Sequence, residues 1–141
     1  MYDRIKGFRD FYPPEMAARR ETIDTVESVA RRYGFREIET PALEFAEMYA
    51  DKSGEEILEE LYVFEDRGGR EVALTPALTP TVARMAGARQ QALTKPVKWF
   101  STRPSRRDGQ VQPGGVRELR QANAHILGSA APTADRDVPA P

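Results

Sequence analysis

The residues most able to do chemistry in this chain are the basic ones that gather between positions 98 and 120. This block holds six basic residues against two acidic ones, a balance of +4 in a chain whose formal net charge is −1. The basic residues are Lys98, Arg103, Arg106, Arg107, Arg117 and Arg120. Arginine side chains pair with phosphate oxygens, and the backbone amides of a glycine-containing loop add further donors. The pattern predicts a site for an anion, either a polyphosphate or an RNA backbone.

The elements that must position these residues are two strand-like runs, residues 98–104 and 116–127, on either side of the basic loop. Earlier in the chain, apolar residues at helical spacing predict a helix over residues 14–33, with Gly34 just beyond its end. That apolar face consists of Ile23, Val26, Ala30 and Tyr33. A short strand is expected over residues 35–40, and Pro41 ends it.

The middle of the chain predicts a short helix, a hairpin and a second long helix. Apolar spacing favours a short helix over residues 54–61 within an acidic stretch. Arg67-Gly68-Gly69 is typical of a tight turn between strands at 61–66 and 70–75. Thr79-Pro80 is typical of a helix start, and that helix is expected to end near Gln91. Together these elements predict an α+β fold, an antiparallel sheet flanked by helices.

Composition narrows the function classes. With no cysteine and a single histidine, His125, the 141 residues offer no cysteine or two-histidine metal site, so we expect no protein-bound metal. No apolar run approaches the ~20 residues of a membrane span, and the start lacks the apolar stretch of a signal peptide. We therefore expect a cytoplasmic protein without a membrane partner.

Four blocks occur in one order: KGFRDFYP at 6–13, GFREIETPALE at 34–44, LTPALTPTVAR at 74–84, and the hairpin at 103–128. Together they resemble the amino-terminal part of the catalytic domain of histidyl-tRNA synthetases of archaeal type, which are class II aminoacyl-tRNA synthetases. The resemblance covers residues 1–128 as a partial catalytic domain, with motif 1 at about 15–44 and motif 2 at about 98–128. Residues 129–141, with three prolines and no periodicity, predict a disordered tail.

The resemblance implies ATP-dependent activation of histidine, with Mg²⁺ bound to the ATP, and transfer of the histidine to its tRNA. Arg107 matches the motif 2 arginine that binds the α-phosphate, and Arg117 is a second ATP-binding candidate. Thr79 and Gln121 match residues of the histidine pocket. Motif 1 implies a homodimer, although its apolar face serves plain core packing equally well. Thr79 as a mere helix cap, and Gln121 and Arg117 as solvated surface residues, are the simpler interpretations.

Several positions depart from the family pattern where ligands bind. The family has a glutamate at the position of Ala77, an aromatic residue at Leu119 and a carboxylate at His125. Asp108-Gly109 lacks the glutamate expected two residues after Arg107. Before that arginine, Ser105 and Arg106 replace large aromatic residues, and Gly115 replaces an arginine after it.

The chain also ends before motif 3 and the anticodon-binding domain. We therefore expect a truncated fragment with little or no activity alone. Two alternatives stay open: a non-catalytic regulatory protein like the synthetase-like subunit of ATP phosphoribosyltransferase, and a basic hairpin that binds RNA without sequence preference.

Overall fold

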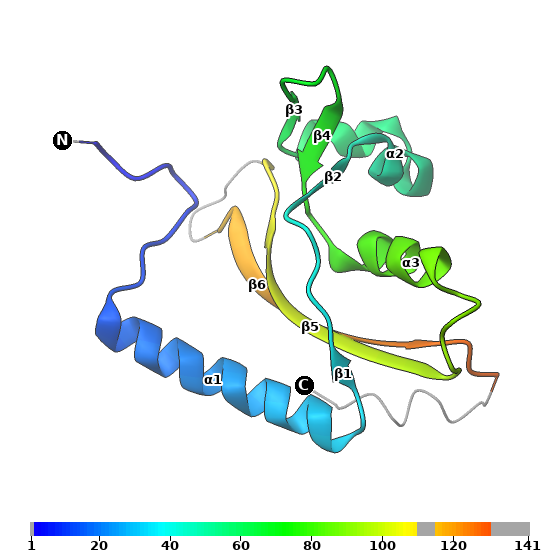
Figure 1. Cartoon of the computed structure of the whole chain (residues 1–141). Coiled ribbons are helices and arrows are strands. Elements are labelled where there is room, and N and C mark those ends of the chain that lie inside the picture. Colours follow the sequence, from blue (N-terminus) through cyan, green and yellow to red (C-terminus); the bar gives the residue numbers. More distant parts are fainter. Residues whose placement is uncertain (1, 110–114, 131–141) are drawn as a thin grey trace. The chain divides into compact units, whose positions relative to one another are not determined.

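The structure is a computed structural model that describes residues 2–109 and 115–130. The elements in chain order are α1 (Pro13–Arg32), β1 (Arg36–Glu37), β2 (Leu43–Phe45), α2 (Glu47–Ser53), the 3₁₀ helix η1 (Glu55–Glu60), β3 (Val63–Glu65), β4 (Glu71–Leu74), α3 (Leu78–Ala88), β5 (Val97–Arg106) and β6 (Glu118–Leu127) (Figure 1). Helices and strands alternate irregularly, which is the predicted α+β class. None of the described helices is both long and apolar enough to cross a membrane.

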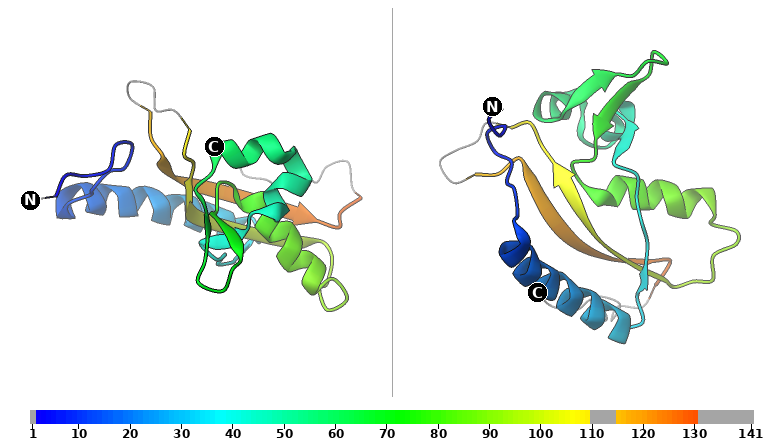
Figure 2. Two further views of the ribbon diagram at one scale, coloured as in Figure 1. Left: turned by 90° about the horizontal axis from the view of Figure 1, so that it is seen from above. Right: turned by 60° about the vertical axis from the view of Figure 1, so that its left-hand side comes forward.

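The chain forms two compact units. The first unit contains Met1–Arg9, Thr40–Gly87 and Pro104–Arg120, and the second contains Asp10–Glu39, Ala88–Arg103 and Gln121–Pro141. The long strands β5 and β6, which are neighbours in one sheet, pass through both units (Figures 1 and 2). The predicted single domain over residues 1–128 stays a prediction, and residues 131–141 of the predicted tail lie outside the described residues.

In the second unit, α1 begins and ends as its sequence predicts. Two prolines occupy its first turn, Glu15 lies near its amino end, and two arginines lie in its last turn, where they suit the helix dipole. Gly34 follows with φ of 79°, a conformation that favours glycine and lets the chain leave the helix. The α1 helix is drawn as the blue ribbon of Figure 1.

The core of the second unit lies where α1 meets β5 and β6. Ala30, Phe35 and Phe100 are its buried residues, and Ala124 and Ile126 pack against them. Ile23 is also buried, but Val26 is 40% exposed, so core packing, one of the two interpretations left open for this face, does not apply to Val26. The apolar face of α1 is therefore only partly used by the described core.

The sheet of the second unit is mixed rather than antiparallel. β1 pairs with β5 in parallel, with Arg36 opposite Trp99 and Glu37 opposite Phe100, and the Ile38 N–H donates to the Phe100 carbonyl at 2.9 Å. The prediction of an antiparallel sheet did not include this parallel pair. A parallel pair needs a long crossover connection, and here the chain between β1 and β5 includes the whole of residues 40–87.

The first unit is built on an antiparallel sheet with strand order β2-β4-β3. α2 and η1 lie against one face of this sheet, where Ala46, Tyr49, Leu61 and Ala73 are buried. The predicted hairpin is confirmed as β3 and β4, although only Gly69 of the glycine pair has a positive φ, 75°. The Asp66 carboxylate closes the turn by accepting from the Gly68 and Arg70 N–H groups at 2.8 and 3.1 Å.

Some element boundaries differ from the predictions. The short helix predicted at 54–61 is the 3₁₀ helix Glu55–Glu60, and the sequence reasoning missed α2 and β2. α3 begins at Leu78, so Thr79 lies inside the helix, and it ends at Ala88 rather than near Gln91. Gly87 and the polar residues after it do not continue the apolar spacing that keeps α3 on its core.

Candidate phosphate-binding site

Arg107 lies in the first unit, directly after the end of β5. Its side chain is exposed, whereas its backbone is fixed, because the Arg107 N–H donates to the Arg117 carbonyl at 3.0 Å. The next residue is held as well, since the Asp108 N–H donates to the Glu60 carbonyl at 2.9 Å. The structure therefore presents an exposed guanidinium group on a firmly anchored backbone. Such an arrangement suits a phosphate ligand, because the backbone pays little ordering entropy when the ligand binds.

Arg117 sits beside Arg107 but in a more enclosed setting. Its guanidinium group lies 3.5 Å from the Asp108 carboxylate, and only 26% of its side chain is exposed. Its Nε points toward the Gly109 carbonyl at 3.4 Å. Part of its charge is thus offset within the protein, and Arg107 is the arginine better placed to meet an incoming anion.

The N-terminal segment supports Arg117, a role that sequence reasoning did not assign to it. The Arg117 N–H donates to the Gly7 carbonyl at 2.7 Å. Gly7 has φ of 90°, and a Cβ at this position would lie 2.8 Å from the Arg117 Cγ, so only glycine fits. The glycine of the KGFRDFYP block was the available signal, because a glycine in such a position often marks a close approach of two chain segments.

Arg106, the last residue of β5, is held by two contacts within the first unit. The Arg106 N–H donates to the Thr75 carbonyl at 3.1 Å, and the Arg106 Nε donates to the Glu118 carboxylate at 2.6 Å. This ion pair gives the charge of Arg106 a partner. The neighbouring Ser105 is 3% exposed.

The remaining predicted site residues are not all brought together. Thr79 is exposed on the first turn of α3 in the first unit, and as a helical residue it is not the N-cap that the sequence suggested. Gln121 belongs to β6 in the second unit. Within the described residues, the contacts join Arg107 to Arg117, but none joins either arginine to Thr79.

Gln121 belongs to a polar row on β6. Side chains two residues apart on a strand point to the same side, which places Gln121, Asn123 and His125 together. Each has a buried polar atom without a hydrogen-bond partner among the described residues: Oε1, Nδ2 and Nε2, respectively. Buried polar atoms are normally satisfied, so this face of the strand is suited to contact with a polar group.

His125 gives this row a pH dependence. Burial lowers the pKa of its imidazole below the ordinary value of 6.5, because desolvation disfavours the charged form. In the window just below pH 6.5 the unfolded chain binds more protons than the folded chain, so folding stability falls as the pH falls. We expect the melting temperature of the wild type to drop between pH 7.5 and 5.5 by more than that of His125→Gln. Equal drops in thermal unfolding followed by circular dichroism would contradict this expectation.

The described residues include no cluster of three or more His, Asp or Glu side chains arranged to hold a metal ion. The family resemblance implies magnesium-ATP as the ligand. The exposed Arg107 fits such a ligand, because it provides positive charge where the phosphates carry negative charge. Leu119, the position where the resemblance implies an adenine-stacking residue, is 41% exposed. A leucine cannot stack on adenine as an aromatic ring does.

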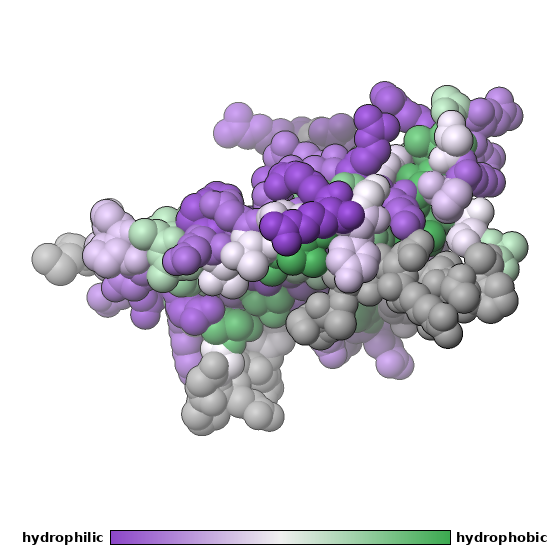
Figure 3. Space-filling model, turned by 90° about the horizontal axis from the view of Figure 1, so that it is seen from below, coloured by the Kyte–Doolittle hydropathy of each residue, from purple (hydrophilic) through white to green (hydrophobic). Residues whose placement is uncertain are grey.

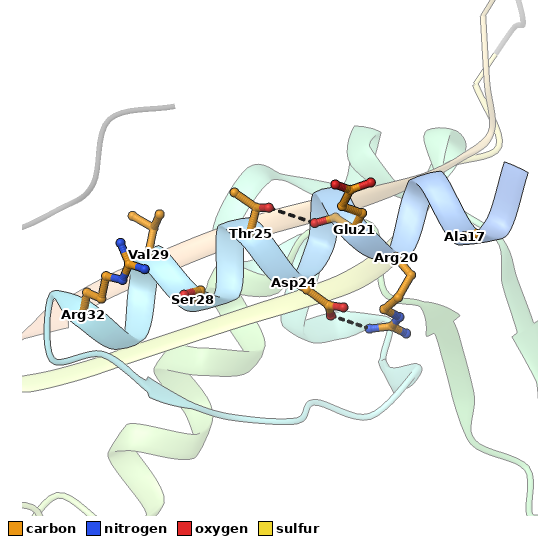
Figure 4. Close-up of a pocket in the computed structure, with 8 residues that line it drawn as sticks. All are labelled: Ala17, Arg20, Glu21, Asp24, Thr25, Ser28, Val29 and Arg32. Carbon is orange, nitrogen blue, oxygen red and sulfur yellow. Dashed lines mark hydrogen bonds and ion pairs between the residues drawn. The ribbon is translucent and has the colours of Figure 1, made fainter.

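A shallow hollow along α1 is the other surface feature of note. It is lined only by residues of this helix in the second unit: Ala17, Arg20, Glu21, Asp24, Thr25, Ser28, Val29 and Arg32 (Figure 4). Arg20 and Asp24 pair across one turn at 3.5 Å, and the Thr25 hydroxyl donates to the Glu21 carbonyl at 2.9 Å. Its polar groups are thus partly paired among themselves, which fits a solvated surface or an interface better than a small-molecule site.

Comparison with known proteins decides the family. A sequence profile described as histidyl-tRNA synthetase matches residues 7–139. The chain belongs to the histidyl-tRNA synthetase family. A histidine–tRNA ligase of Natronomonas pharaonis is 68% identical over 138 residues, which cover 98% of this chain and 32% of the relative. One from Pyrococcus abyssi is 41% identical over 138 residues, with the same two coverages. The chain thus spans about a third of the length of these ligases.

Solved structures agree with the family assignment. A histidine–tRNA ligase subunit from Alicyclobacillus acidocaldarius superposes with a TM-score of 0.82 at 27% identity, over 98% of this chain and 39% of the other. A Bacillus halodurans protein titled ATP phosphoribosyltransferase regulatory subunit/histidyl-tRNA synthetase gives 0.83 at 24% identity, over 96% and 35%. The second likeness shows the fold alone. The predicted partial class II synthetase fold is confirmed.

Proposed function

We propose that this chain carries the α-phosphate-binding part of a histidine–tRNA ligase, and that Arg107 is the residue that binds the phosphate. The observation that carries the proposal is the exposed Arg107 guanidinium on a backbone held by the Arg117 and Glu60 carbonyls. The histidyl-tRNA synthetase family supports ATP, histidine and the histidine tRNA as the substrates.

In the proposed reaction, a carboxylate oxygen of histidine attacks the α-phosphorus of ATP in line. A new phosphorus–oxygen bond forms to give histidyl adenylate, and the bond to the departing pyrophosphate breaks. Negative charge shifts over the phosphoryl oxygens as this happens, and a guanidinium group already in place stabilises it. Arg107 has this role, and Arg117, partly neutralised by Asp108, supports it. Magnesium neutralises further phosphate charge while bound to ATP.

Thr79 and Gln121 are proposed as remnants of the histidine pocket. The buried, unpartnered Oε1 of Gln121 supports a polar contact at its position. Ala77, in contrast, offers no charge to the ammonium group of histidine. His125 likewise offers no negative charge to the imidazole ring of the substrate histidine. Because both charges are missing, we propose weak histidine binding and little or no ligase activity for the chain alone.

The resemblance of residues 15–44 to motif 1 implies that the partner is a second copy of this chain. A homodimer through the region of α1 is supported by Val26, which is 40% exposed on that helix. Figure 3 shows hydrophobic residues, coloured green, between hydrophilic ones, coloured purple. The proposed site of action is the cytoplasm, where tRNA is charged.

Arg107→Ala tests the phosphate assignment. The change removes a charge-assisted contact worth about 1.5–3 kcal/mol, so we expect magnesium-ATP to bind roughly 10- to 150-fold more weakly by titration calorimetry. Arg89→Ala, which removes an exposed arginine of the second unit, is the matched control and is expected to bind normally. Unchanged binding in Arg107→Ala would refute the assignment. Histidine-dependent exchange of pyrophosphate into ATP by the chain alone would refute the proposed lack of activity.

A further inference from the structure

Tyr62, which follows η1 in the first unit, has a buried hydroxyl oxygen. The backbone of this residue is fixed, because its carbonyl accepts the Leu74 N–H at 3.0 Å. Its ring lies 6.2 Å from the Phe8 ring, measured between centroids. The Tyr62 Oη itself has no hydrogen-bond partner among the described residues. Buried hydroxyl groups are normally paired, since an unpaired one costs free energy. This hydroxyl is therefore available to donate to an acceptor that turns toward it.

The ion pair of Asp108 and Arg117 lies close to this hydroxyl. The Asp108 N–H donates to the Glu60 carbonyl at 2.9 Å, two residues before Tyr62. Both charges act on the hydroxyl. Burial raises the pKa of Tyr62 above its ordinary value of 10.0, the negative charge of Asp108 raises it further, and the positive charge of Arg117 opposes the rise. The Tyr62 hydroxyl therefore keeps its proton at neutral pH and can donate it in a hydrogen bond.

The ion pair itself is loose. The Arg117 guanidinium lies 3.5 Å from the Asp108 carboxylate, and 41% of the Asp108 side chain is exposed. Exposed ion pairs contribute little net stability, whereas a phosphate group offers an arginine more charge and more acceptor oxygens than one carboxylate does. Phosphates bound at Arg107 therefore compete with Asp108 for Arg117. The carboxylate that Arg117 leaves behind lacks a donor, and on its buried side Tyr62 can provide one.

We propose that Asp108 holds Arg117 away from the ligand until phosphates are bound at Arg107, and that the Tyr62 hydroxyl then donates to the Asp108 carboxylate in place of Arg117. The inference rests on the proposed function and adds the regulation of the same site. Tyr62 is a positioning residue in this account, because it acts through Asp108 and does not touch the nucleotide. No proton is transferred in the exchange, since the Tyr62 hydroxyl stays protonated throughout.

The test is a double-mutant cycle on magnesium-ATP binding, measured with the full chain by titration calorimetry. Tyr62→Phe removes the hydroxyl but keeps the ring, and it is expected to weaken binding roughly 3- to 10-fold, the net effect of one lost hydrogen bond. Asp108→Ala frees Arg117 and is expected to strengthen binding roughly 2- to 5-fold. In the Asp108→Ala background, Tyr62→Phe is expected to change nothing further, because no carboxylate remains to accept from the hydroxyl.

Two variants of the first unit are the matched controls. Asp51→Ala removes an exposed carboxylate on α2, so it measures the general effect of one negative charge fewer on a polyanion ligand. Tyr2→Phe removes the hydroxyl of a fully exposed tyrosine. Both controls are expected to bind magnesium-ATP within about twofold of the wild type, because salt screens distant exposed charges.

Two results would overturn the inference while leaving the proposed function in place. One is an equal loss, or no loss, from Tyr62→Phe with and without Asp108, because the hydroxyl would then not act through the carboxylate. The other is an Asp108→Ala variant that binds no more tightly than Asp51→Ala. Coupling between Tyr62 and Asp108 together with unchanged binding in Arg107→Ala would instead refute the phosphate assignment of Arg107. Absence of magnesium-ATP binding in every variant would overturn both.

Discussion

Phe100→Ala is expected to lose about 3–5 kcal/mol of folding stability, because it removes a large side chain from a closed core. Phe100 is 2% exposed and packs with Ala30 and Phe35 where α1 meets β5. The Arg31 guanidinium lies 5.4 Å from its ring centroid, so a cation–π contact is lost as well. The free energy of unfolding of a small domain is usually about 5–15 kcal/mol, so this loss is a large share of the total.

The chain provides its own reporter for this result. Trp99, its single tryptophan, precedes Phe100 in the second unit, so its fluorescence follows unfolding of that unit in urea. Phe64→Ala, which truncates a phenylalanine that is 46% exposed in the first unit, is the matched control and is expected to leave the Trp99 transition almost unmoved. A Phe100→Ala midpoint equal to that of the wild type would mean that this core does not form.

Arg84→Ala is expected to be the most damaging change at an ion pair of the first unit. The Glu44 side chain is only 8% exposed, and its Oε1 accepts from the Arg84 Nη2 at 2.6 Å and from Nε at 3.2 Å. Removing the arginine leaves a buried carboxylate without its partner. Loss of a buried partner costs up to about 3–5 kcal/mol, and we expect about 2–3 here because Arg84 is half exposed.

Changing the other partner of this ion pair, Glu44, is expected to cost less folding stability. In Glu44→Gln the amide oxygen still accepts a hydrogen bond, and the half-exposed Arg84 regains water, so we expect a loss of about 1 kcal/mol or less. Hydrogen exchange of the β4 amides measures the opening of this sheet, and the double variant completes a mutant cycle. Equal losses for the two single variants would contradict the account, because they would mean that burial of Glu44 is not what makes the pair asymmetric.

Much of the fold followed from local signals in the sequence. The bounds of α1 follow from two prolines at its start and Gly34 beyond its end, and the β3–β4 hairpin follows from its glycine turn. β2 and α2 were missed because the first is three residues long and the second seven, too short for a periodic pattern to emerge. The parallel β1–β5 pair joins residues more than 60 positions apart, and no local signal encodes it.

The arginines of the candidate site could be predicted from the sequence, whereas the contacts that support them could not. The charge excess beside a glycine-containing loop predicted only an anion site among six basic residues. The resemblance to motif 2 singled out Arg107 and Arg117, and the structure joins these two through one backbone hydrogen bond. The support from Gly7 could not be predicted from spacing, because it depends on a contact between two ends of the first unit. The burial that lowers the pKa of His125 likewise depends on what packs around β6, which the residue types on that strand do not specify.

The central claim is that Arg107 binds the phosphates of ATP in this chain. A two-dimensional amide NMR spectrum of the full chain, recorded before and after addition of magnesium-ATP, tests it most directly. The account predicts dispersed peaks, shifts concentrated at Arg107, Asp108 and Arg117, and loss of those shifts in Arg107→Ala. A dispersed spectrum that does not respond to magnesium-ATP, or identical shifts in Arg107→Ala, would contradict it.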